Sequence, residues 1–328
     1  DITTIQHSKI KDFLKQTPIA VSEASTPYVL DIGVTLHSTH HTVYARTAQY
    51  HTGLCQITID GKSFFERPIP QTTSSIDHSV LSMQDIIAFA DTCNLEDVKD
   101  ILDQQIAYNM AISEEGIKGK YGAAIGRTLL MAYGDSVHNR AKAMAAAGSD
   151  ARMNGCELPV VINSGSGNQG ITTSVPVIIY AKELGVSQEK LYRALLVANL
   201  TSIHLKTGIG CLSAYCGATS AGCGAGAGIM YLHGGHFNEI AHTVVNALAI
   251  NSGVVCDGAK ASCAAKIASG VESGLLGMQM YMHGKEFYSG DGIVGSCVED
   301  TIKNVGQLAH DGMAETDKEI IKIMLKNC

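Results

Sequence analysis

The spacing of apolar residues along the chain changes near residue 80. Before this point the apolar residues alternate or cluster in short β-prone runs, and "CQITIDGKSFFE" (55–66) places Asp60-Gly61 between two of them. Asp-Gly is a favoured dipeptide of type I′ hairpin turns, so this stretch predicts a β-hairpin. The other elements that we expect in the first part are a short helix over 7–16 and strands over 28–36 and 42–50.

After residue 80 the pattern becomes helical. Helices are expected from about residue 82 onward. Over 95–121 apolar residues recur every three or four positions, and the helix there is expected to end near Gly116. Further helices are predicted at roughly 122–133, 137–148, 171–184, 187–204, 211–233, 237–250, 257–282, 293–310 and 315–326. The chain therefore predicts an α+β fold with a mixed segment over 1–80 and a helical domain over 81–328. The Pro-, Ser- and Thr-rich stretch 67–79 is expected to link them.

The central part of the helical region is almost free of charge. Between residues 201 and 270 the charged residues are Lys206, Glu239, Asp257, Lys260 and Lys266. Helices that are apolar all round belong at the centre of a bundle. Within them, "ATSAGCGAGAGIMYL" (218–232) has four alternating glycines, each costing about 1 kcal/mol relative to alanine in a helix. Either tight helix–helix packing or a bulky cofactor would explain them.

Composition and charge exclude several classes of function. The 328 residues are 45% hydrophobic and 17% charged, with a net charge of −7 and no Lys/Arg-rich run. We therefore expect a globular protein that binds no nucleic acid and does not enter a membrane. The chain begins without Met or a secretory signal, and its ten cysteines lie mostly in apolar, Gly/Ala-rich sequence. These features predict reduced thiols in the cytoplasm and a start partway through a longer polypeptide.

A glycine-rich segment offers two readings. Gly165-Ser-Gly167-Asn-Gln-Gly170 formally matches a dinucleotide fingerprint, but a nucleotide site needs a second strand after the helix, and none is predicted here. The segment also places small polar residues before a helix start, where backbone N–H groups attract anions such as carboxylates. A helix start that is merely capped by Ser or Asn stays open as the simpler alternative.

Four long motifs make the chain recognisable. They are "AAAGSDARMNGCELPVVINSGSGNQGITTSVPVIIYA", "LSAYCGATSAGCGAGAGIMYL", "CDGAKASCAAK" and "GIVGSCVEDTIKNVG". In this order they resemble the L-cysteine desulfidase family, which is allied to the α region of the iron–sulfur L-serine dehydratases. The resemblance runs from about residue 85 to the C-terminus, and the first part also looks like the middle segment of that family.

The resemblance implies a [4Fe-4S] cluster that is held by three cysteines and leaves one iron open for substrate. By this resemblance, two of the three cluster-binding cysteines correspond to Cys256 and Cys297. The third belongs to a Gly-Cys-Thr-Glu-Pro type segment that this sequence lacks, so we expect it in an N-terminal segment outside this chain. From the residues alone, Cys256 is expected at a chain turn or helix start and Cys297 at a helix start, where N–H groups stabilise a thiolate. Packing is the expected role of Cys211, Cys216, Cys223 and Cys263, and of the remaining four.

The implied reaction is β-elimination of L-cysteine to sulfide, ammonia and pyruvate. A base near neutral pKa must remove the Cα proton, and the candidates are His204, Lys206, Lys260 and His138. Ser164, Ser166, Asn168 and Gln169 are expected to hold the carboxylate and amine of the amino acid. Asp150 and Arg152 are expected to brace that loop as an ion pair. Alternatively, Arg152 binds the carboxylate of the amino acid through two hydrogen bonds.

Three alternatives stay open at this point. The same scaffold would act on L-serine as a dehydratase, or a cluster-free relative would bind amino acids or serve a structural role. A nucleotide-dependent oxidoreductase is the third. The sequence leaves the oligomeric state undecided, and a homodimer is compatible with it.

Overall fold

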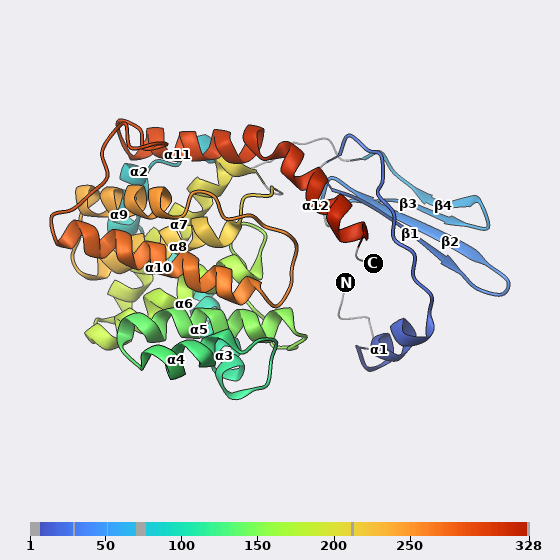
Figure 1. Ribbon diagram of the computed structural model, residues 1–328, viewed down its shortest axis with the longest axis horizontal. Helices are drawn as coiled ribbons and strands as arrows, with labels where there is room; N and C mark the ends of the chain where they lie inside the picture. The colour runs from blue at the N-terminus through green and yellow to red at the C-terminus, as the bar shows by residue number, and fades with distance from the viewer. Residues whose placement is uncertain (1–6, 29, 51, 70–76, 211–212, 327–328) are drawn as a thin grey trace. The chain divides into compact units, whose positions relative to one another are not determined.

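The protein divides into two compact units. The computed structural model describes residues 7–28, 30–50, 52–69, 77–210 and 213–326 (Figure 1). One unit comprises the described residues within Asp1–Ser74 and Thr316–Cys328, and the other comprises Ser75–Glu315. None of the described helices is both long and apolar enough to cross a membrane.

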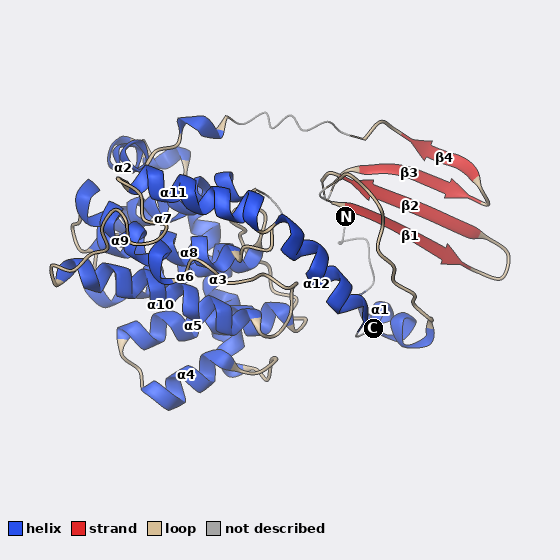
Figure 2. Cartoon of the chain, turned by 45° about the horizontal axis from the view of Figure 1, so that its top comes forward, coloured by secondary structure: helices blue, strands red, loops and turns tan. Residues whose placement is uncertain are grey.

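The first unit contains a four-stranded antiparallel sheet in the order β1-β2-β3-β4 (Figure 2). Its strands are β1 (Asp31–His37), β2 (Thr42–Ala48), β3 (Leu54–Ile59) and β4 (Lys62–Glu66). Its helices are α1 (His7–Gln16) and α12 (Ala314–Lys326), and α12 begins two residues before the unit boundary. Asp60 and Gly61 both have positive φ, 51° and 76°, as a type I′ turn requires. The predicted hairpin is therefore confirmed.

The second unit is a bundle of helices around α8 (Figure 1). Its helices are α2 (Met83–Thr92), α3 (Lys99–Lys118), α4 (Ile125–Tyr133), α5 (Val137–Met153), α6 (Gly167–Leu184), α7 (Gln188–Ile209), α8 (Gly217–Leu232), α9 (Phe237–Ile250), α10 (Cys263–Met282) and α11 (Val298–Gln307). Short helical turns occupy His78–Val80, Leu95–Asp97 and Leu308–Gly312. The predicted α+β class is confirmed; most of 67–79, the predicted linker, lies outside the described residues.

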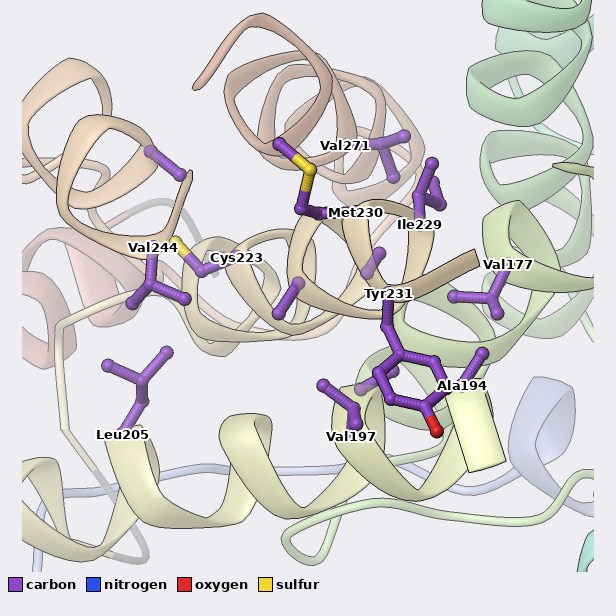
Figure 3. Close-up of a cluster of buried hydrophobic side chains, with 14 of the residues drawn as sticks. Val177, Ala194, Val197, Leu205, Cys223, Ile229, Met230, Tyr231, Val244 and Val271 are labelled. Carbon is purple, nitrogen blue, oxygen red and sulfur yellow. The ribbon is translucent and has the colours of Figure 1, made fainter. Parts of the chain in front are cut away.

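Helix α8 is buried from its second residue to its end. From Ala218 to Leu232 every residue is buried, and the helix contacts α6, α7, α9 and α10. Figure 3 shows Cys223 and Ile229 of α8 among apolar side chains that include Val244 and Val271. The charge-poor sequence therefore does lie at the centre of the bundle, as its pattern predicts.

Tight packing accounts for the alternating glycines. A Cβ atom on Gly222 would lie 2.0 Å from the carbonyl oxygen of Gly270, and one on Gly226 would lie 2.7 Å from that of Gly274. Gly224 and Gly228 approach the backbone of α7 in the same way. The four glycines thus let α8 contact α10 on one side and α7 on the other.

Two details differ from the sequence pattern. Helix α3 continues through Gly116 to Lys118, because Gly116 lies against the backbone of α5, where a Cβ would be 1.9 Å from the oxygen of Ala147. The Gly165–Gly170 segment leads into α6, and the sheet of the first unit is the only one in the part of the chain that the structure describes. The dinucleotide interpretation has no βαβ unit to support it here.

Candidate functional site

A tight turn precedes helix α6. Asn163 and Ser166 form an antiparallel bridge with backbone hydrogen bonds in both directions. The two residues between them, Ser164 and Gly165, have φ of 48° and 81°. Positive φ at both central positions defines a type I′ turn, and for Ser164 this conformation carries backbone strain. The turn directs the chain into α6 at Gly167.

Side-chain amides hold this turn on the bundle. Asn163 Nδ2 donates to Asn199 Oδ1 at 2.9 Å, and Asn199 exchanges two hydrogen bonds with Gln105 of α3. The hydroxyl of Ser164 donates to Asn163 Oδ1 at 2.8 Å. Ser164 therefore serves the turn itself. Nothing in its sequence neighbourhood distinguishes this role from substrate binding.

Arg152 lies against the start of α6. Its Nη1 donates to Asn168 Oδ1 at 3.3 Å, and its Nε would be 2.4 Å from a Cβ on Gly167. Asp150 points elsewhere, accepting the N–H of Gly126 at 3.0 Å with its Oδ2, and burial raises the pKa of this carboxyl. The Asp150–Arg152 ion pair is thus not formed, because the two side chains leave α5 toward different neighbours.

Gln169 connects α6 to α8. Its side chain packs on Gly217, the first residue of α8, where a Cβ would be 2.5 Å from Cδ of Gln169. Gln169 is 7% exposed, and its Oε1 has no hydrogen-bond partner among the described residues. The starts of α6 and α8 therefore lie side by side.

Two cysteines meet at the start of α8. Tyr215 and Val255 form an isolated bridge, Cys216 N–H donates to Val254 O at 2.9 Å, and Cys256 N–H donates to Ala214 O at 2.6 Å. This places the thiols of Cys216 and Cys256 in hydrogen-bonding contact. Cys216 was expected inside a helix as a packing residue, but it is the N-cap of α8. Nothing in the sequence around Cys216 indicates Cys256 as its partner.

The surroundings of Cys256 favour its thiolate. The hydrogen bond from Cys216, the N–H of Gly258, and the charges of Lys266 and Lys260 together lower the pKa of Cys256 from 9.0 to about 6, against the opposing effect of burial. The same hydrogen bond, with burial, raises the pKa of Cys216. Cys256 follows a bridge residue and lies in the loop before α10, so of its two expected places the helix start is excluded.

Two lysines surround the residue after Cys256. Lys260 Nζ lies 2.5 Å from Asp257 Oδ1, and Lys266 Nζ pairs with the same oxygen and donates to Val255 O at 2.7 Å. Lys260, and then Lys266, lower the pKa of Asp257 to about 2. Lys266 therefore contacts the residues on both sides of Cys256, a role that the sequence did not reveal.

The other predicted bases lie on helices α5 and α7 rather than on the loop of Cys256. His204 Nε2 is 2.7 Å from Glu299 Oε2, which joins α7 to α11. His138 of α5 pairs in the same way with Glu272 of α10 at 2.9 Å. Lys206 is 8% exposed on α7. Of the four candidates, Lys260 is the one on the loop that carries Cys256.

Cys297 lies in a separate setting. It is the exposed N-cap of α11, and it lines a cavity of about 380 Å³ with residues of α9 and of the segments 287–289 and 294–298. Cys256 is not among the described residues that line this cavity. The described contacts of Cys256 involve Ala214, Cys216 and Gly258. Its predicted partnership with Cys297 stays a prediction.

A [4Fe-4S] cluster requires more ligands than the described residues bring together. Cys216 and Cys256 supply two adjacent sulfur atoms, which suits a cluster that is bound by thiolates. Within the described ranges no group of three His, Cys, Asp or Glu side chains is arranged to hold a metal ion. The pair alone is therefore not a complete cluster site, and Cys211 lies outside the described residues.

Comparisons with known proteins identify the family of the chain. A UPF0597 protein of Desulfitobacterium hafniense is 55% identical over 330 residues, covering 100% of this chain and 77% of that protein. UPF0597 proteins of Lachnoclostridium phytofermentans and Treponema denticola are 55% and 42% identical, covering 84% and 99% of this chain and 66% and 77% of their own lengths. The family model described as serine dehydratase alpha chain matches residues 18–322. The chain therefore belongs to the serine dehydratase alpha chain family.

Proposed function

We propose that the protein is a lyase that catalyses β-elimination from L-cysteine, giving sulfide, ammonia and pyruvate. The observation that carries this proposal is the contact between Cys216 and Cys256 beside the starts of α6 and α8. It places the Cys216 thiol and the Cys256 thiolate beside a helix start that favours anions. The family description supports an elimination on a β-substituted amino acid.

The proposed cofactor is a [4Fe-4S] cluster held through Cys216 and Cys256, with further ligation from residues beyond those described. An open iron of such a cluster supplies Lewis-acid assistance to the leaving group. Cys297 is the sequence-based alternative to Cys216 as the second ligand. The contact geometry favours Cys216, because it already touches Cys256.

The elimination balances without net oxidation or reduction. A base removes the Cα proton, and the Cβ–S bond breaks with its electron pair leaving on sulfur as hydrosulfide. Water then hydrolyses the resulting enamine, after tautomerisation, to pyruvate and ammonia. Lys260 is the candidate base on the loop that holds Cys256, but it pairs with Asp257 as an ammonium and would have to lose a proton before acting as a base. His204 and Lys206 are the alternatives on α7.

An anaerobic assay of the complete gene product after iron and sulfide reconstitution tests the proposal. We expect sulfide, ammonia and pyruvate in equal amounts from L-cysteine. Pyruvate from L-serine, without activity on L-cysteine, would instead establish the dehydratase that the family description favours. A protein that binds no iron and converts neither amino acid would refute the lyase proposal and favour a cluster-free binding or structural role.

A further inference from the structure

The two outer strands of the sheet differ in how they treat their free edge (Figure 2). Strand β4 is five residues long, carries Lys62 and Glu66 at its ends, and pairs with β3 through a register shift. Charges and bulges of this kind discourage the pairing of a further strand. Strand β1 is seven residues long, shows no register shift against β2, and has neither proline nor charge between Asp31 and His37. Its sequence therefore leaves this edge open to another strand.

Strand β1 also carries an exposed row of apolar side chains. Ile32, Val34 and Leu36 alternate along the strand and are 51%, 49% and 52% exposed. The apolar face continues across the sheet, because Leu36 lies opposite Val43, and Val43 lies opposite Ile59 on β3. Contiguous apolar surface beside an unprotected strand edge is typical of a site where another chain pairs.

The backbone of β1 shows which of its groups point away from β2. Just before the strand, the carbonyl oxygen of Leu30 accepts the N–H of Gln49 at 2.8 Å, so Leu30 directs its backbone groups toward the β2 side. In an antiparallel pair this direction alternates from one residue to the next. The outward N–H and C=O groups therefore belong to the odd-numbered residues of β1, which are Asp31, Gly33, Thr35 and His37.

Strand β1 is complementary to a second copy of itself. When two copies pair antiparallel about a twofold axis at Val34, the middle residue, Gly33 of each copy lies opposite Thr35 of the other. Outward backbone groups then meet outward backbone groups along the whole strand. At both ends the carboxylate of Asp31 lies opposite the imidazole of His37, so the charges are complementary and no like charges meet. The two sheets become one continuous sheet with its apolar side chains on one face.

We propose that β1 is a dimerisation strand, which pairs antiparallel with β1 of a second copy about a twofold axis at Val34. Each copy contributes seven residues of strand, fewer than the roughly 20–30 residues a side of a standard interface. The dimer is therefore reversible, and its population rises with protein concentration. This pairing concerns the sheet alone and does not depend on the proposed elimination reaction.

Disulfide trapping in the purified complete gene product tests the pairing and its register. In a non-hydrogen-bonded antiparallel pair the opposite Cα atoms lie about 4.5 Å apart, a distance that a disulfide spans. Val34→Cys is therefore expected to link two copies under mild oxidation. Ile32→Cys is the matched control, because in this register the two Ile32 Cα atoms lie about 14 Å apart and form no disulfide. Peptide mass spectrometry separates the expected disulfide from any that the native cysteines form.

Sedimentation velocity over a range of concentrations measures the dimer without oxidation. Thr35→Pro removes an outward N–H that bonds no residue of β2, so the sheet keeps its own hydrogen bonds while the added strand loses one from each copy. We expect this variant to raise the dimer dissociation constant at least about tenfold. Thr35→Ser keeps the N–H and is expected to match the wild type.

Three results would overturn the proposal. The first is a wild-type protein that stays monomeric at every concentration and a Val34→Cys variant that forms no disulfide with itself, since another part of the polypeptide would then cover this edge. The second is an equal disulfide yield from Val34→Cys and Ile32→Cys, which would exclude the register. The third is a dimer that a folded Thr35→Pro variant does not weaken. If Thr35→Pro does not fold, the comparison of the two cysteine variants decides.

Discussion

The thiol of Cys216 hydrogen-bonds to the sulfur of Cys256 beside the backbone bridge between Tyr215 and Val255. This contact joins the segment that leads into α8 to the loop that precedes α10. Cys216 is thus both the N-cap of the central helix and the neighbour of Cys256, whose pKa it lowers.

Alkylation of Cys256 in iron-free protein should follow its lowered pKa. Because the thiolate is the nucleophile, the rate with iodoacetamide is expected to rise through pH about 6, well below the ordinary thiol value of 9.0. Cys216→Ala removes the hydrogen-bond donor, so the midpoint should move upward. Peptide mass spectrometry resolves Cys256 from the other thiols, and Cys297→Ala is the control. A midpoint that Cys216→Ala does not move would contradict the hydrogen bond.

Substitution of Gly222 should disrupt the centre of the bundle. Its Cβ would lie 2.0 Å from the oxygen of Gly270, so α8 and α10 would have to separate. Overpacking typically costs 1–3 kcal/mol, and a backbone obstacle places Gly222→Ala at about 3 kcal/mol or more. Gly253→Ala, where nothing lies within 4 Å, should change stability by less than about 0.5 kcal/mol. Thermal unfolding measures both, and equal effects would contradict the packing account.

The ion pairs between α5 and α10 should make the free energy of unfolding depend on pH in the acid range. His138, at 2.9 Å, and Lys142, at 2.5 Å, hold Glu272, and the pKa of this carboxyl falls from 4.5 to about 2. A lowered carboxyl pKa stabilises the fold above the unfolded value, and this contribution disappears as pH falls from about 4.5 to about 2. Glu272→Gln should therefore lose stability at neutral pH and show a flatter stability curve in this window.

Urea unfolding at several pH values measures this dependence. Glu157→Gln, at an exposed position in a loop, is the matched control and should keep the wild-type slope. If Glu272→Gln retained the wild-type slope between pH about 4.5 and about 2, the interactions of His138 and Lys142 with Glu272 would not contribute to acid stability.

Local sequence predicted much of the fold. The Asp60-Gly61 hairpin, the helix at His7–Gln16 and the buried, charge-poor α8 all follow from turn chemistry and periodicity. Helix α3 ends at Lys118, two residues beyond Gly116, near which its end was predicted. Gly116 itself is a contact with α5, and a glycine that allows close approach looks the same in sequence as one that ends a helix.

The site was predictable only where its residues are neighbours in sequence. Ser166, Asn168 and Gln169 lie at one helix start, as their spacing indicated. The contact of Cys216 with Cys256 depends on a bridge between distant segments, and a lone Cys in Gly/Ala-rich sequence is most often a packing residue. Lys266 was missed for the same reason, because its helix brings it back onto Val255 and Asp257.

The iron content of two single-cysteine variants tests the central claim most directly. Cys216→Ser and Cys297→Ser are each reconstituted anaerobically in the complete gene product, and bound iron and sulfide are measured beside the wild type. If adjacent sulfurs of Cys216 and Cys256 hold the cluster, Cys216→Ser loses most of its iron and Cys297→Ser keeps it. Full iron in Cys216→Ser, with loss in Cys297→Ser, would contradict this account.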